Sequence, residues 1–193
     1  MKKVILLFAV VAMAVTASAQ MSWNVKAGLG LSNYTGKDAG TDAHFAYRVG
    51  LGMSYTVAPS FAIEPTLYFA QMGAKFKKED GGKSINPLYL QLPIMAAYSV
   101  KISDGAKIVF NAGPYVGFGL GGKVDGVKIF GNGEDAMGGK SFDAGLGIGA
   151  RGELSNFIVG IDYQLGLTKA FKTEEGENGT KNMGAFLTVG YKF

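Results

Sequence analysis

The C-terminal segment of this chain, residues 182–193, alternates between two kinds of side chain. Every second residue from Met183 to Phe193 is apolar, and the positions between them are mostly small or polar. A period of two is the spacing at which side chains share one face of a β-strand. Seven further segments carry the same alternation, so the sequence predicts an all-β fold.

The connections between these eight segments alternate in length. Three are tight turns, at Ala58-Pro59, Ser103–Gly105 and Ser155-Asn156, and four are longer and polar. Both ends of the mature chain then fall on the side of the tight turns, as in an eight-stranded antiparallel up-and-down transmembrane barrel. The segments lie near residues 22–34, 43–57, 60–76, 86–101, 106–122, 140–154, 156–170 and 182–193, and the longer loops are 36–42, 77–84, 123–139 and 172–181.

The apolar face of these segments also has an order along each strand. Aromatic residues gather near both strand ends, and aliphatic residues fill the band between them. Two aromatic belts around an aliphatic band match the two interfaces of a lipid bilayer, so we expect this face to contact lipid. The belts comprise Trp23, Tyr55, Phe61, Tyr98, Phe110, Phe157, Tyr191 and Phe193 near the tight turns, and Phe45, Tyr47, Phe69, Phe118 and Phe142 near the longer loops.

The opposite, inward face carries the candidate site. A hairpin that turns at Ser155-Asn156 puts Arg151 opposite Gly160 and diagonal to Asp162, within reach of an arginine side chain. Charges inside a narrow barrel must be paired, which favours a plugged interior, whereas in a selective pore they would line water. The predicted lumen-lining polar network comprises Lys26, Arg48, Glu64, Gln91, Asp143, Arg151, Glu153, Asp162, Gln164 and Lys192.

Residues 1–19 have the composition of a secretory signal peptide. Lys2 and Lys3 precede an apolar run that is too short to span a bilayer, and Ala17-Ser18-Ala19 fits the cleavage rule. We therefore expect the barrel domain over residues 20–193. The chain has no cysteine, which excludes disulfides and thiolate metal sites. Its basic residues are scattered, so no nucleic-acid-binding surface is predicted.

Three further patterns are weak. Gly117–Gly122 has the spacing of a dinucleotide-binding loop but precedes a polar loop, and Gly138–Ser141 resembles a P-loop ending although Glu134 replaces the required glycine. A lipid-modifying enzyme of the outer membrane would need a histidine beside a serine or an acid. His44, the only histidine, is expected at the long-loop rim, where nothing else singles it out, so such an enzyme is a remote alternative. We expect no catalytic residue, metal or soluble cofactor, and the inward glycines are expected to relieve crowding.

The longer loops carry charges of both signs. These are ordinary solvated charges, or they contact lipopolysaccharide phosphates and bridging divalent cations. They include Lys75, Lys77, Lys78 and Lys83 in the second longer loop and Glu174, Glu175 and Glu177 in the fourth.

Prolines fall inside or near the third, fourth and fifth expected strands. Because proline cannot donate to a ladder, we expect bulges or strand ends at these positions, and the registers there are the least determined. The residues are Pro65, Pro87, Pro93 and Pro114.

Three stretches carry a family pattern: Leu88–Ile94 reads LYLQLPI, Ala112–Gly117 reads AGPYVG and Leu187–Phe193 reads LTVGYKF. They resemble the Y-L-[EQ]-[ILV]-P-[IL], A-G-P-Y-x-G and terminal strands of PorT-like outer-membrane β-barrel proteins, the "porin family". The resemblance implies the barrel fold and a final aromatic, Phe193, that the barrel-assembly machinery reads, but no activity. Gln91 stands where the family more often has Glu.

The sequence therefore favours a small non-enzymatic barrel of a Gram-negative outer membrane, with periplasmic termini and a structural or surface-interaction role. Passive transport of small or amphipathic solutes through the lumen or a lateral gap is the alternative. The expected partners are outer-membrane lipid and lipopolysaccharide, and no protein partner besides the assembly machinery is predicted.

Overall fold

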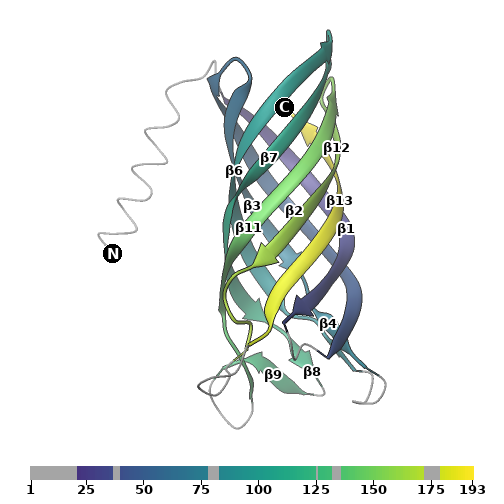
Figure 1. The fold of residues 1–193 in the computed structure, drawn as a ribbon, viewed down its shortest axis with the longest axis vertical. Helices are drawn as coiled ribbons and strands as arrows, with labels where there is room; N and C mark the ends of the chain where they lie inside the picture. The colour runs from purple at the N-terminus through teal and green to yellow at the C-terminus, as the bar shows by residue number, and fades with distance from the viewer. Residues whose placement is uncertain (1–20, 37–39, 78–82, 125, 132–135, 172–178) are drawn as a thin grey trace, which may run out of the picture.

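The chain folds into a closed antiparallel barrel of eight long strands (Figure 1). The computed structural model describes residues 21–36, 40–77, 83–124, 126–131, 136–171 and 179–193, so the expected signal peptide lies outside the described residues. The eight strands of the wall are β1 (Met21–Thr35), β2 (Thr41–Ala58), β3 (Phe61–Gln71), β6 (Leu88–Ser103), β7 (Ala106–Gly121), β11 (Phe142–Leu154), β12 (Phe157–Gly166) and β13 (Lys181–Lys192).

Strand β1 closes the ring because it pairs with both β2 and β13. At mid-height Leu29 lies opposite Tyr47 on one side and Leu187 on the other. Closure leaves no unpaired sheet edge, which is the condition for a β-structure to stand in hydrocarbon. The predicted fold class is confirmed.

The two faces of the wall divide as the alternation predicts. Leu146 and Ile161 are exposed on the outer surface, whereas Arg151 and Glu64 are buried inside the barrel. Nearly all residues of the two expected aromatic belts are exposed on the outer face; only Tyr55 is half-buried. The tight turns and the C-terminus share one end of the barrel (top in Figure 1). Among the described residues, no helix is long and apolar enough to cross a membrane.

Two tight turns contact each other at that end. Ser155 adopts a left-handed backbone with a φ of 52°, and its N–H donates to the carbonyl of Gly105 at 2.6 Å. This bond joins the β11–β12 turn to the β6–β7 turn, so the rim is held together by backbone as well as by strands.

The proline prediction is correct at one site and wrong at three. A register shift between Leu88 and Tyr89 follows Pro87 directly. By contrast, Pro65, Pro93 and Pro114 lie inside β3, β6 and β7 without a shift in the register on either side. Each proline removes one donor, so the ladder can lose a bond locally and still keep its register.

The longer loops fold further than their polar composition suggests. At the long-loop end, β4 (Ala74–Phe76) pairs with β2 and with β5 (Ser84–Ile85). A separate three-stranded sheet is formed by β8 (Lys123–Val124), β9 (Val127–Phe130) and β10 (Ala136–Gly139). It lies below the barrel in Figure 1, so one end of the barrel is covered by folded chain.

We predict that a charge on the outer wall destabilises the barrel in a depth-dependent way. Leu187→Arg, in the middle of β13, should lower the free energy of unfolding in lipid vesicles by about 2–4 kcal/mol. The matched variant Leu120→Arg, near the long-loop end of β7, should lower it by about 0–1 kcal/mol. Equal costs at both positions would contradict the proposed placement of the apolar band.

Candidate functional site: the charged lumen

The inward face brings the ten predicted polar residues into the barrel interior. Eight of them are buried, and Asp162 and Lys192 are partly exposed. They belong to seven of the eight long strands, and they fall into groups at different heights rather than into one bonded layer. The buried eight are Lys26, Arg48, Glu64, Gln91, Asp143, Arg151, Glu153 and Gln164.

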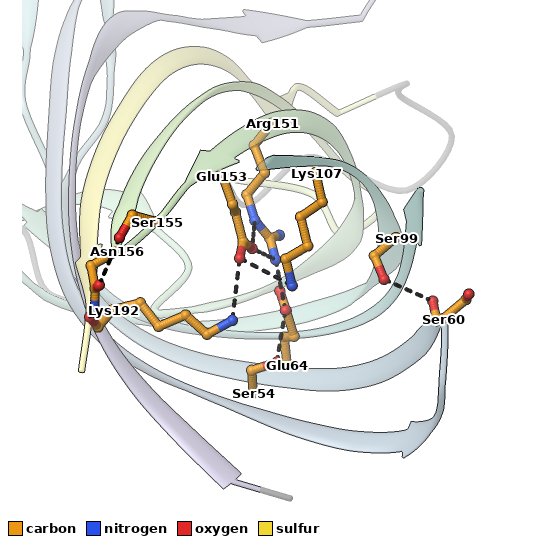
Figure 2. Close-up of polar contacts among 10 residues, drawn as sticks. All are labelled: Ser54, Ser60, Glu64, Ser99, Lys107, Arg151, Glu153, Ser155, Asn156 and Lys192. Carbon is orange, nitrogen blue, oxygen red and sulfur yellow. Dashed lines mark hydrogen bonds and ion pairs between the residues drawn. The ribbon is translucent and has the colours of Figure 1, made fainter. Parts of the chain in front are cut away.

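Nearest the tight turns, Arg151 joins two buried carboxylates. Its Nη2 donates to Glu64 Oε1 at 2.7 Å, and its Nε donates to Glu153 Oε1 at 2.9 Å (Figure 2). The Ser54 hydroxyl adds a bond of 3.0 Å to the same Glu64 oxygen. Because these charge-assisted bonds form away from water, the guanidinium offsets part of the cost of burying both carboxylates.

Glu153 forms ion pairs with two lysines in addition to Arg151. Lys107 and Lys192 each place Nζ 3.2 Å from Glu153 Oε2. Lys107 was not among the predicted lumen residues, although it has the inward parity of Val109 and Asn111 on the same strand. We call Ser54, Glu64, Lys107, Arg151, Glu153 and Lys192 the short-turn network.

At mid-height, Arg48 lies between two aromatic rings and pairs with Asp162. Its guanidinium carbon is 4.5 Å from the Tyr68 ring centroid and 4.3 Å from that of Phe186. Its Nη2 also donates to Asp162 and, at 3.0 Å, to the Thr188 hydroxyl. Stacking and charge pairing together fix this arginine in the lumen.

The expected contact between Arg151 and Asp162 is not the one that forms. Arg151 does lie opposite Gly160, as the hairpin register predicts. However, Arg151 turns to Glu64 on β3, and Asp162 pairs with Arg48 on β2, a strand that is not its neighbour in the sheet. The diagonal distance permitted the pair, but a narrow lumen also offers partners from strands that are distant in sequence.

Small residues make room for these long side chains. A Cβ added to Gly160 would lie 2.4 Å from Arg151 Cβ, and one added to Gly149 would lie 2.4 Å from Asp162 Oδ1. The expectation that the inward glycines relieve crowding is confirmed at these two positions.

In the long-loop half of the lumen the contacts are mostly uncharged. Asp143 accepts hydrogen bonds from the hydroxyls of Tyr115 and Thr168, at 3.0 and 2.9 Å. Gln91 and Gln164 donate to the Met72 sulfur, at 3.3 and 3.0 Å. Sulfur is a weak acceptor, so these amides fill space more than they stabilise charge.

An apolar cluster that was not predicted from the sequence closes the long-loop end. Phe130 of β9 packs edge-on against Tyr89, with ring centroids 5.5 Å apart, and its ring occupies the space a Cβ on Gly119 would need. The apolar residues Val127, Ile129 and Phe130 were the available signal, but the segment is too short to stand out within a long loop. We call this cluster the apolar cap; it comprises Tyr34, Ala74, Ile85, Ile129 and Ala170, with Phe76, Val124, Phe130, Met137 and Phe171 packed against them.

Little space remains between the two ends. One cavity of about 40 Å³ and another of about 20 Å³ lie inside the lumen. They have room for only a few water-sized particles, since one water needs roughly 10–15 Å³. A wider recess of about 480 Å³ opens at the tight-turn end above Lys107, Glu153 and Lys192.

The weaker sequence patterns fall at positions without a reactive geometry. Gly117–Gly121 lies within β7, so no helix begins there to hold a phosphate. His44 is half-buried in β2, opposite Ser32. The Ser32 hydroxyl both donates to and accepts from the backbone of Gly73, at 2.7 Å. No cluster of three or more side chains suited to a metal ion occurs in the described part of the chain.

The closed wall and filled lumen define a small β-barrel of the outer membrane. Residues 16–172 match the family described as "Outer membrane protein beta-barrel domain", and the chain belongs to this family. No curated protein sequence matches the chain.

Solved structures share this fold at low sequence identity. Neisserial surface protein A has a TM-score of 0.55 and 11% identity, with 89% of this chain and 97% of that chain covered. The outer membrane enzyme PagL has a TM-score of 0.53 and 16% identity, with 87% and 98% covered. OprG from Pseudomonas aeruginosa has a TM-score of 0.50 and 13% identity, with 90% and 96% covered. At these identities the likeness shows the fold alone.

We predict that Arg151→Gln is strongly destabilising. It leaves the buried Glu64 without an ion-pair partner, while Glu153 keeps Lys107 and Lys192. The free energy of unfolding should therefore fall by about 3–5 kcal/mol in equilibrium denaturation of the folded barrel. The control, Lys101→Gln, breaks an exposed ion pair with Asp104 at the rim and should cost at most about 1 kcal/mol. Similar losses in both variants would contradict a central role for Arg151.

Proposed function

We propose that this barrel is a non-enzymatic structural or surface-interaction protein of the outer membrane whose lumen is largely plugged. The proposal rests on the observation that the lumen is obstructed at both of its ends. Ion-paired side chains fill the tight-turn half, and the apolar cap covers the long-loop end. A side chain that is bonded across the lumen stabilises the wall but obstructs a water path.

We propose that the tight-turn end, with both termini, faces the periplasm. Short periplasmic turns and longer external loops are the usual arrangement in such barrels. The three stretches that resemble PorT-like proteins lie on β6, β7 and β13, which is compatible with membership of that narrower group. Phe193, exposed directly after β13, is then positioned for recognition by the barrel-assembly machinery.

The long-loop end is the proposed interaction surface. Its exposed lysines would attract the phosphates of lipopolysaccharide, and this attraction weakens as salt screens it. Glu174, Glu175, Glu177 and Lys78 lie outside the described residues. The exposed lysines that the structure describes there are Lys75, Lys77, Lys83, Lys123, Lys128 and Lys140.

Passive transport of small solutes is the second candidate. The recess of about 480 Å³ at the tight-turn end favours it, because solutes could enter there as far as Glu153. Beyond that point the path meets the bonds between Arg151 and Glu64.

Planar-bilayer recording separates these two candidates. We expect no steady single-channel steps from the wild-type barrel, because the short-turn network obstructs the lumen. The variant Ile129→Ala/Phe130→Ala removes part of the apolar cap and should also stay closed, since the ion pairs remain. Bilayers treated with detergent alone serve as the control, and steady steps from the wild type would favour passive transport.

Enzymatic activity on lipid is the remote candidate, and His44 is the residue that would carry it. Its cross-strand neighbour Ser32 already uses its hydroxyl in two bonds to Gly73, so no activated nucleophile is evident beside the histidine. We expect His44→Ala to leave the lipid A profile unchanged in mass spectra, relative to cells expressing the wild type. A lipid A species that depends on both the protein and His44 would overturn the non-enzymatic proposal.

A further inference from the structure

A recess of about 480 Å³ opens to solution at the tight-turn end of the barrel. This volume lies within the range of about 300–1,000 Å³ that is usual for small-molecule sites. Three lysines, four serines and one glutamate contribute to its lining. Glu153 lies at its inner side, where the short-turn network obstructs the lumen, so a solute that enters the recess meets a wall of side chains instead of an open path.

Positive charge exceeds negative charge around Glu153. Lys107 and Lys192 each place Nζ 3.2 Å from Glu153 Oε2, and Figure 2 shows them reaching it from different strands. Arg151 also contacts Glu153, but the charge of Arg151 is offset by that of Glu64. One carboxylate therefore faces two lysines. Each ammonium carries three N–H donors and directs at most one of them to Glu153, so further donors can point into the recess.

A third lysine adds a like charge directly beside Lys107. Lys101 lies opposite Lys107 in the β6–β7 ladder, and both side chains line the recess. Like charges in directly opposite positions destabilise a sheet. Lys101 pairs with Asp104, but these side chains are 73% and 98% exposed, so water screens the pair and it contributes little. An anion bound between the two lysines would remove their repulsion.

Serine hydroxyls supply neutral donors around the three lysines. Ser60 and Ser103 come from two different turns, and a hydroxyl group can rotate to donate into the recess. Donors that arrive from several strands and turns suit an anion with several oxygens, because each oxygen can accept from a different donor. Among the described residues that line the recess, three lysines oppose one carboxylate, so the lining favours an anion with more than one negative charge.

A phosphate monoester has these properties. It carries a charge of about −1.5 to −2 at pH 7 and three strong acceptor oxygens, and lysine is a common ligand of phosphate. A carboxylate ligand would bring only one negative charge and two oxygens, and Glu153 already supplies such a group. The volume of the recess also leaves room for the organic group that bears the phosphate.

We propose that this recess binds the phosphate group of a small, water-soluble phosphate monoester through Lys101, Lys107 and Lys192. The recess opens at the mouth of the barrel, and the closed wall of strands separates it from lipid, so the ligand is a solute and not a membrane headgroup. The site goes beyond the proposed plugged scaffold, because the ligand binds without crossing the lumen. It also holds whichever side of the membrane the tight-turn end faces.

The test is an NMR titration of the folded barrel in maltoside micelles, with glycerol phosphate as the probe. Maltoside contains no phosphate, so the detergent does not compete. We expect the amide signals of Lys107 and Lys192 to shift and to saturate. Dimethyl phosphate, which has the diester of a phospholipid headgroup, should bind at least about tenfold more weakly at equal ionic strength, because it carries less charge. Absence of saturable shifts at these residues, or equal binding of the diester, would overturn the proposal.

Three variants locate the site. Lys107→Gln removes one charged donor and should raise the dissociation constant for glycerol phosphate at least about tenfold, whereas Lys107→Arg should retain most of the affinity. Lys128→Gln, which removes an exposed lysine at the long-loop end, is the matched control and should bind as the wild type does. Wild-type affinity in Lys107→Gln would contradict the assignment of the site to this recess.

A second variant keeps the proposal testable if Lys107→Gln fails to fold. Lys101 is 73% exposed, so Lys101→Glu leaves the buried part of the short-turn network in place. The new carboxylate lies opposite Lys107 at the mouth of the recess and competes with the phosphate for that lysine. We expect saturable shifts with glycerol phosphate to disappear in this variant. Shifts that match those of the wild type would overturn the proposal.

Discussion

A single closed layer of strands separates lipid from the interior, and most of this structure follows from that closure. Because β1 pairs with both β2 and β13, every strand satisfies its neighbours and no edge faces hydrocarbon. An eight-stranded ring is also narrow, so inward side chains from opposite walls meet. The lumen is therefore filled by contacts such as Arg48 with Asp162 rather than left as an open channel.

Filling a narrow lumen with charges requires both partners and space. Arginine meets both needs, because its planar guanidinium binds two carboxylates at once and also stacks on rings. Arg151 uses the first property and Arg48 the second. The glycines opposite long side chains are equally necessary, since a single methyl group at Gly160 would collide with Arg151. Rigidity at this level suits a scaffold whose interactions occur at its ends.

The two ends of the barrel differ in physical character. At the tight-turn end, lysines and Glu153 remain in contact with an open recess. At the long-loop end, short strands carry apolar residues such as Ile129 over the lumen. A small barrel with these ends can present different surfaces to the two sides of a membrane. The family and the fold of the compared structures agree with such a barrel, and the role assigned to each end remains our proposal.

The sequence by itself determined the strands, the closed barrel and the face that each residue occupies. These follow from a period of two, which is local and readable along the chain, as at Leu146 and Arg151. Only the tertiary structure decided which charges meet: Arg151 pairs with Glu64, 87 residues away, instead of its diagonal neighbour Asp162. It also decided that the loop bearing Phe130 covers the barrel. Both depend on distances across the lumen, which closure and side-chain volume set together and no local pattern encodes.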